Sequence, residues 1–290
     1  MLKLAKILCP VDFSEFSARA LDCAYSFARH FGSRLFVQHV TEPVLALYEG
    51  LISPEIVQIA YSQKLIHIEA QMRELVGKYQ GENVQGETVV QVGSAGDLIL
   101  AFAEEHKIDL ITMGTHGRRG FDRLVMGSTL ERVLRKARCA VLAVRESVRG
   151  SLNSASPDEF FQLRRILWCT DFSENSPRAL EFALSLAFAY GAEISLLHVL
   201  ETAGGAEQER HVLELLDEVI PDEARTWARA VPVVRRGEPY QKIIEHAADA
   251  QTDLIVMGVR GRNIVDLAIF GSTTQRVIQL GPCPVLTVLN

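Results

Sequence analysis

The chain has 290 residues, of which 48% are hydrophobic and 23% are charged, and its formal net charge is -6. This composition is typical of a globular protein and excludes disordered and collagen-like chains. The length suggests two domains, and the acidic balance leaves no general basic surface for nucleic acid. Because no apolar run approaches the roughly 20 residues that span a bilayer and no signal-peptide pattern opens the chain, we expect a cytoplasmic protein without membrane contact.

The sequence contains an internal repeat. Asp-Phe-Ser-Glu at Asp12 recurs at Asp171, an offset of 159 residues, and Gly-Ser-Thr at Gly127 recurs at Gly271, an offset of 144 residues. Between these motifs the second copy is therefore shorter than the first. A polar stretch rich in Gly, Ser, Asn and Pro separates the copies and has the composition of a linker. We expect a first domain at 1–146, a linker at 147–163 and a second domain at 164–290.

Short apolar runs alternate with amphipathic stretches in each copy, which predicts parallel strands joined by crossover helices. The strands expected in the first copy are 5–11, 34–40, 87–92, 109–113 and 140–144. Those expected in the second copy are 165–170, 193–199, 231–235, 253–257 and 284–288. Ser17 and Ser176 are the expected caps of the first helix in each copy.

Pro232 lies inside the third strand of the second copy and lacks an N–H for a strand on its other side, so this strand should lie at a sheet edge. An α/β fold follows, with two tandem Rossmann-like domains. Each domain should contain a five-stranded parallel sheet of order 3-2-1-4-5 with helices on both faces. The apolar fifth strands would lie at the other edge, where backbone must be covered, and we expect them to pair and make the chain a pseudo-twofold dimer of itself.

Both copies contain Gly-x2-Gly-x9-Gly-Ser after the fourth strand. Glycines at a strand-to-loop junction let backbone approach a ligand closely and adopt positive φ. The Gly-Ser-Thr sequence then opens a helix, whose free N–H groups and dipole favour an anion such as a polyphosphate. Arg118, Arg260 and Arg262 would add local positive charge, and His116 is expected to contact phosphate.

Asp12 and Asp171 follow the first strand of each copy, where the strand order reverses and a crevice is expected. A carboxylate there can hold ribose hydroxyls. The alternative is that the glycines only form tight turns and that Asp12 caps a local turn.

These two motifs together resemble the universal stress protein family, here as a tandem pair covering nearly the whole chain. The resemblance implies an adenine nucleotide alpha hydrolase-like fold, and in that family the glycine motif marks the ATP-binding branch. The first implied site comprises Asp12, Val40, Met113, Gly114, His116, Gly117, Arg118, Gly127, Ser128 and Thr129. The second comprises Asp171, Val199, Met257, Gly258, Arg260, Gly261, Arg262, Gly271, Ser272 and Thr273. The second copy departs from the first where Arg260 replaces His116.

The leading hypothesis is a regulatory stress-response module that binds ATP, or ADP or AMP, with Mg²⁺ brought by the nucleotide. It would associate through its fifth strands, with a homodimer of the tandem chain and an unidentified protein partner as further expectations. Neither a P-loop lysine motif nor a His/Cys cluster at metal spacing occurs, so we assign no catalytic residue and no metal ligand. The alternatives are a slow ATPase or autophosphorylating enzyme acting at Ser128 or Thr129, and a scaffold that binds no nucleotide. The five cysteines are expected to be buried, reduced thiols.

Overall fold

The computed structural model describes residues 4–42, 54–79, 84–117, 126–145, 162–173, 176–201, 205–259 and 271–289. The first half contains β1 (Lys6–Pro10), α1 (Glu15–Phe31), β2 (Arg34–Thr41), α2 (Pro54–Gly77), β3 (Gly86–Val92), α3 (Ala95–Glu105), β4 (Leu110–Gly114), α4 (Ser128–Lys136) and β5 (Ala140–Val144). The second half contains β6 (Arg165–Thr170), α5 (Ser176–Tyr190), β7 (Glu193–Leu200), α6 (Ala206–Glu218), α7 (Asp222–Arg225), β8 (Ala230–Arg236), α8 (Pro239–Asp249), β9 (Leu254–Gly258), α9 (Ser272–Leu280) and β10 (Val285–Val288).

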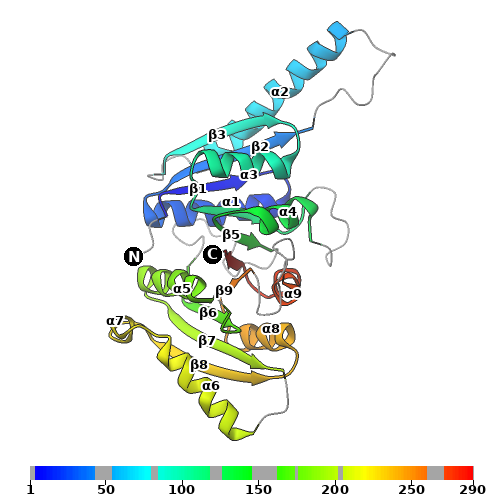
Figure 1. The fold of residues 1–290 in the computed structure, drawn as a ribbon. Coiled ribbons are helices and arrows are strands. Elements are labelled where there is room, and N and C mark those ends of the chain that lie inside the picture. Colours follow the sequence, from blue (N-terminus) through cyan, green and yellow to red (C-terminus); the bar gives the residue numbers. More distant parts are fainter. Residues whose placement is uncertain are drawn as a thin grey trace.

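These strands form one sheet of order β3-β2-β1-β4-β5-β10-β9-β6-β7-β8 (Figure 1). Each half has the expected order 3-2-1-4-5 and is parallel throughout, so the predicted α/β fold of two tandem Rossmann-like domains is confirmed. β8 lies at the end of the sheet, with Pro232 paired to Leu196 of β7. The prediction from Pro232 is therefore also confirmed.

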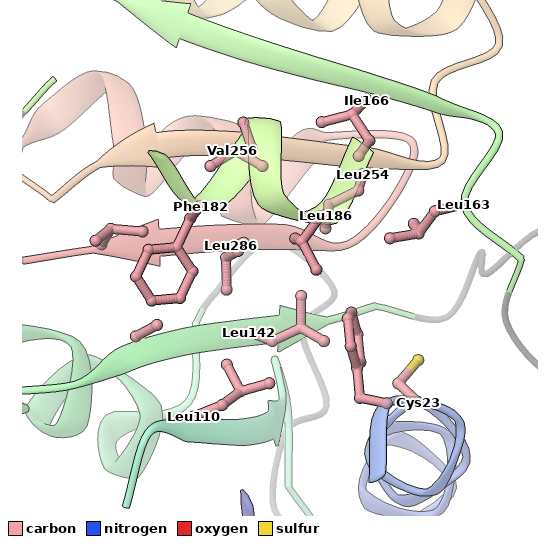
Figure 2. Packing of buried hydrophobic residues seen from close by; sticks show 14 of the residues in the cluster. Cys23, Leu110, Leu142, Leu163, Ile166, Phe182, Leu186, Leu254, Val256 and Leu286 are labelled. Carbon is pink, nitrogen blue, oxygen red and sulfur yellow. The ribbon is translucent and has the colours of Figure 1, made fainter. Parts of the chain in front are cut away.

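The two halves join through their fifth strands, as expected from the sequence. β5 and β10 pair antiparallel, with Leu142 opposite Leu286 and Val141 opposite Thr287. The Thr287 hydroxyl donates a hydrogen bond to the Val141 carbonyl at 3.2 Å. Figure 2 shows Leu142 and Leu286 facing the same apolar layer as Phe182. The sheet as a whole is therefore mixed.

Helices cover both faces of this sheet. On one face, α1, α2, α5 and α6 contribute to a core cluster that includes Ala20, Met72, Ala183 and Leu216. On the other, α3, α4, α8 and α9 contribute Ile99, Val133, Ile243 and Val277 to a second cluster. Successive strand residues alternate between the two clusters, because neighbouring side chains of a strand point to opposite faces. Among the described helices, none combines the length and apolarity needed to cross a bilayer.

The start of α1 differs from expectation. Ser14, not Ser17, is the N-cap, and its hydroxyl accepts a hydrogen bond from the Ser17 N–H at 3.2 Å. Ser17 is buried inside the first turn of the helix. The helix begins early because the chain leaves β1 through a tight turn at Phe13, which has a φ of 62°. In the second half Ser176, which was expected as the cap, is likewise inside the helix, as the first residue of α5.

Candidate functional site

The candidate site lies at the carboxyl ends of β1 and β4. These strands are neighbours, with Ile7 opposite Leu110 and Leu8 opposite Ile111. β1 connects onward to β2 on one side, whereas β4 connects to β5 on the other, so the strand order reverses between them. This is the position at which open α/β sheets form a ligand crevice. β6 and β9 have the same relation in the second half.

A tight turn after β1 orients Asp12. Its Oδ1 accepts hydrogen bonds from the Ser14 N–H at 3.1 Å and from the Ser14 hydroxyl at 2.6 Å. In the second half, Asp171 Oδ1 likewise accepts from the Ser173 N–H at 3.0 Å. One carboxylate oxygen therefore shapes the turn in each copy, as the alternative interpretation of Asp12 expects.

An aromatic pair supports each turn. Phe13 and Phe172 have φ values of 62° and 57°, which are uncommon for large side chains. The Phe13 ring centroid lies 4.6 Å from that of His39, and the ring centroids of Phe172 and His198 are 4.9 Å apart. His39 Nδ1 is 2.7 Å from the Val11 carbonyl oxygen, and His198 makes the matching contact with Thr170 at 2.8 Å. Both histidines thus have the structural role expected of them.

Gly117 brings the loop after β4 against Asp12. A Cβ at position 117 would lie 2.7 Å from Asp12 Oδ2, closer than real Cβ contacts. Only glycine lets the backbone pass this carboxylate oxygen without displacing it. Two motifs that are more than 100 residues apart in the chain therefore meet in the crevice.

The other glycines of the first motif have different roles. A Cβ at Gly114 would come within 2.8 Å of the Phe16 main-chain carbon, so Gly114 allows α1 to pack against β4. At Gly127 the nearest atom would be the Thr115 carbonyl oxygen at 3.4 Å. Positive φ was expected at these glycines, and this expectation was wrong for the described glycines of both motifs. The close approach of backbone, and not the left-handed conformation, requires glycine at 114 and 117.

The first turn of α4 opens beside this loop. Gly127 is its N-cap, and the Gly127 N–H donates to the Thr115 carbonyl at 3.0 Å. Ser128 is exposed and Thr129 is half-buried. In the second half the Gly271 N–H donates to the Val259 carbonyl at 3.3 Å, and Ser272 and Thr273 match Ser128 and Thr129 in exposure. Glycine caps offer no side-chain oxygen to the helix amides, which leaves these amides for solvent or a ligand.

The remaining expected residues fall into four groups. Val40 and Val199 are half-buried near the ends of β2 and β7, where a ligand could contact their main chain. Met113 and Met257 are core residues, each with 6% exposure, beneath the crevice. Gly258 ends β9, and its carbonyl accepts a hydrogen bond from the Thr274 hydroxyl at 3.2 Å. Four expected residues lie outside the described residues, namely Arg118, Arg260, Gly261 and Arg262.

His116 is buried rather than extended into the crevice. Its exposure is 7%, its ring centroid is 5.1 Å from that of Phe16, and its Nδ1 is 3.0 Å from the Thr115 hydroxyl. The sequence reasoning missed Ser14 and Phe13, which orient Asp12. The signal that could have found them is their recurrence in the second copy as Ser173 and Phe172.

The described residues contain no group of three or more His, Cys, Asp or Glu side chains suited to a metal ion. All five cysteines are free, and four of them are buried as expected, whereas Cys139 is half-buried. Burial raises the pKa of Cys139 to about 12 and also raises the pKa values of Cys23 and Cys169. These thiols stay protonated near neutral pH and are therefore poor metal ligands.

Comparison with known proteins identifies the family. The model of the universal stress protein family matches residues 3–145 and 162–288. The chain belongs to the universal stress protein family. A universal stress protein of Methanocaldococcus jannaschii is 33% identical over 147 residues, which cover 49% of this chain and 82% of that protein. Another, of Thermus aquaticus, is 33% identical over 134 residues, which cover 43% of this chain and 98% of that protein.

Solved structures share the two-domain arrangement. A universal stress protein from Archaeoglobus fulgidus has a TM-score of 0.73 at 23% identity, with 99% of this chain and 97% of that chain covered. A putative universal stress protein from Pseudomonas aeruginosa has a TM-score of 0.61 at 14% identity, covering 99% of this chain and 93% of that chain. At these identities the likeness establishes the fold, and function must be argued from the site.

Proposed function

We propose that this universal stress protein is a regulatory module that binds an adenine nucleotide in the crevice between Asp12 and the start of α4. The observation that carries the proposal is the approach of Gly117 to Asp12 Oδ2, where a Cβ would lie 2.7 Å away. The absence of a side chain at Gly117 lets the loop after β4 lie close to the carboxylate. Such a glycine-lined cradle beside a helix start is suited to a phosphate chain.

In this assignment each part of the crevice has one task. The Asp12 carboxylate accepts hydrogen bonds from the ribose hydroxyls, and the first-turn amides of α4 with the Ser128 hydroxyl bind phosphate oxygens. The backbone at Val40 contacts the base. Mg²⁺ would arrive with the triphosphate and neutralise part of its charge.

The second half has a related candidate site at Asp171, Gly258 and Gly271. Its support is the repeated turn at Asp171 and the repeated anchoring of the α9 start through Gly271. We propose domain boundaries at 1–146 and 164–290 around the linker at 147–163. Occupancy of the sites would alter association, either of two whole chains or of the chain with a protein partner. Size-exclusion chromatography with and without ATP measures the first of these effects.

The direct test starts with freshly purified protein. Denaturation followed by mass spectrometry of the released small molecules should yield an adenine nucleotide, counted in moles per chain, and it distinguishes ATP from ADP and AMP. Incubation with labelled ATP then separates the hypotheses. Retention without turnover supports the regulatory module, turnover or labelling of Ser128 or Thr129 supports a slow enzyme, and absence of binding supports a scaffold.

Gly117→Ala provides the sharper test of the cradle. The added methyl group must displace the Asp12 side chain, so calorimetry should show at least a tenfold loss of ATP affinity in the first site. Thermal unfolding should change little, because the displaced atom is the free end of a side chain. Gly205→Ala, at the start of α6, is the matched control. Wild-type affinity in Gly117→Ala would overturn the assignment.

A further inference from the structure

A hollow lies in the second half of the chain, away from the candidate site at Asp171. It has a volume of about 560 Å³ and is lined by residues at the amino ends of β6 and β7, the end of α5 and the segment before β8. The lining includes Arg164, Arg165, Phe188, Glu193, Trp227 and Arg229. Because β6 and β7 are parallel, their amino ends lie on the edge away from Asp171. We call this feature the Arg–Trp hollow.

Two aromatic side chains are exposed in the hollow. Phe188 is 46% exposed and Trp227 is 38% exposed, and their ring centroids are 5.0 Å apart at an interplanar angle of 74°. This edge-to-face arrangement leaves ring surface accessible to a further flat group. Exposed large aromatic side chains gathered at one place are typical of binding surfaces.

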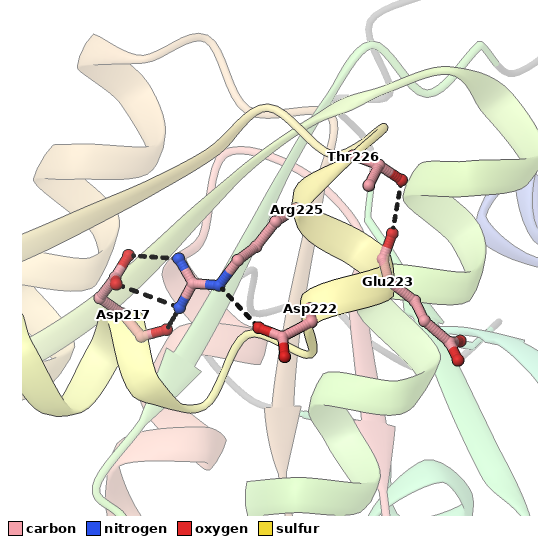
Figure 3. A network of polar contacts seen from close by, with 5 residues as sticks. All are labelled: Asp217, Asp222, Glu223, Arg225 and Thr226. Carbon is pink, nitrogen blue, oxygen red and sulfur yellow. Dashed lines mark hydrogen bonds and ion pairs between the residues drawn. The ribbon is translucent and has the colours of Figure 1, made fainter.

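Polar contacts of the preceding residues hold the segment that carries Trp227 in place. It follows the short helix α7, where Arg225 Nη2 lies 3.0 Å from Asp217 Oδ2 at the end of α6 (Figure 3). Arg225 Nε is also 3.7 Å from Asp222 Oδ1, and the Thr226 hydroxyl donates to the Glu223 carbonyl at 2.8 Å. These contacts order the segment before a ligand arrives, which lowers the entropic cost of binding.

The charge of the hollow is positive although the whole chain carries -6. Glu193 is paired with Arg229 at 3.0 Å. Arg165 Nη1 donates to the Ala250 carbonyl at 2.7 Å, and Arg164 Nη2 donates to the Gln162 side chain at 3.1 Å. Asp253 Oδ2 accepts the main-chain N–H groups of both Arg164 and Arg165 at 2.9 Å. Within the ranges that the structure describes, no ion pair joins either guanidinium to a carboxylate. Arg165 Nη1 also donates to the Gln251 side chain at 3.2 Å, so the guanidinium of Arg164 is the one offered to an anion.

The internal repeat shows that the fold itself does not require this lining. At the offset of 159 residues, Arg164 corresponds to Ala5, Phe188 to Arg29 and Glu193 to Arg34. The first half therefore forms the same strands and helix with neither the arginine nor the aromatic residue. Arg165, in contrast, corresponds to Lys6, which donates to the His106 carbonyl as Arg165 donates to the Ala250 carbonyl, so Arg165 has a packing role. Arg164 and Phe188 belong to the second half alone, which favours a ligand role for these two residues.

We propose that the Arg–Trp hollow binds a small aromatic carboxylate. The aromatic ring packs against Trp227 and Phe188, and the carboxylate accepts charge-assisted hydrogen bonds from Arg164. A volume of about 560 Å³ is in the usual range for small-molecule sites. The inference is independent of the nucleotide assignment, because the hollow shares no lining residue with either proposed nucleotide site.

The experiment titrates the full chain, saturated with ATP, with phenylacetate. Calorimetry should show saturable binding of about one molecule per chain. Tryptophan fluorescence should change with the same affinity, because Trp227 is exposed whereas the other tryptophan, Trp168, is 1% exposed. Acetate lacks the ring and 2-phenylethanol lacks the charge, and both should bind at least tenfold more weakly.

Variants locate the ligand. Arg164→Ala should weaken phenylacetate binding about tenfold. Arg138→Ala, which removes an exposed arginine that does not line the hollow, should bind as the wild type does. Trp227→Phe should retain binding that Trp227→Ala loses. The proposal is overturned by an absence of saturable binding, by equal binding of 2-phenylethanol, or by unchanged affinity in Arg164→Ala. It is also overturned if phenylacetate binds more weakly to the ATP-saturated chain than to the chain without ATP.

Discussion

Three glycines of one motif occupy three different environments. Gly114 faces the main chain of Phe16, Gly117 faces the end of the Asp12 side chain, and Gly127 has only ordinary contacts. A methyl group at each position would therefore meet a different resistance. The main chain of Phe16 can move only if helix α1 shifts, whereas the Asp12 carboxylate can rotate away.

Gly114→Ala should lower the free energy of unfolding by about 1–3 kcal/mol, the usual cost of overpacking. The added Cβ would lie 2.8 Å from the main chain of Phe16. Urea denaturation measures the change. Gly127→Ala is the comparison and should cost less, and equal losses in the two variants would contradict this reading of the motif.

Asp22 gives a pH-dependent prediction. Burial raises the pKa of Asp22, and the hydrogen bond from Tyr79 and the charges of Arg19 and Lys78 only partly oppose it. The folded state therefore prefers the protonated carboxyl. Its contribution to stability is fully present below the unfolded pKa of about 3.9 and is lost as the pH rises through the raised value.

Asp22→Asn keeps an acceptor for Tyr79 but carries no charge. The variant should gain stability relative to the wild type as the pH rises from about 4 to about 7, because only the wild type must ionise a half-buried carboxyl. Urea denaturation at several pH values tests this. A stability difference that does not vary with pH would refute it.

At the scale of elements, the start of α1 depends on one serine. Ser14 has extended backbone, caps the helix through the Ser17 N–H, and also donates its hydroxyl to Asp12. The same residue therefore links the stability of the helix to the orientation of the candidate ligand group.

Ser14→Ala should lower the free energy of unfolding by about 1 kcal/mol, as expected for loss of an N-cap. Thermal or urea unfolding measures the loss. Ser62→Ala is the matched control, because Ser62 is exposed within α2 and its hydroxyl bonds only to the Gln58 carbonyl. A cost for Ser14→Ala no larger than the control's would show that the cap does not hold the helix.

At the scale of the whole molecule, the junction of β5 and β10 makes two domains into one sheet. Leu142 and Leu286 are opposite each other at 0% and 2% exposure, and the same core cluster extends from α1 to α5. Neither half buries its fifth strand without the other. The two domains should therefore unfold together.

Leu286→Ala should destabilise the whole chain by about 2–5 kcal/mol, the range for a buried leucine. Urea denaturation should show one transition for both halves, and hydrogen exchange should accelerate in β4 of the first half as well as in β9. Leu280→Ala, at a leucine with 41% exposure, is the control. Two separate transitions, with only the second shifted, would contradict a shared sheet.

Much of the fold could be predicted because its signals are local or repeated. Apolar runs predicted the strands, and Pro232 predicted that its strand lies at a sheet edge. The apolar fifth strands predicted the junction between the two halves. The cap of α1 could not be chosen correctly between Ser14 and Ser17, because that choice depends on the turn at Phe13. Likewise, which glycine faces the ligand space depends on where α1 packs.

The sequence by itself determined the duplication, the strand order and the family, since these follow from periodicity and motif spacing along the chain. Tertiary structure alone decided that Gly117 meets Asp12 and that Arg164 lies near Trp227. Each of these contacts joins segments far apart in the chain. Their distance is set by how strands and helices pack, and no local pattern encodes it.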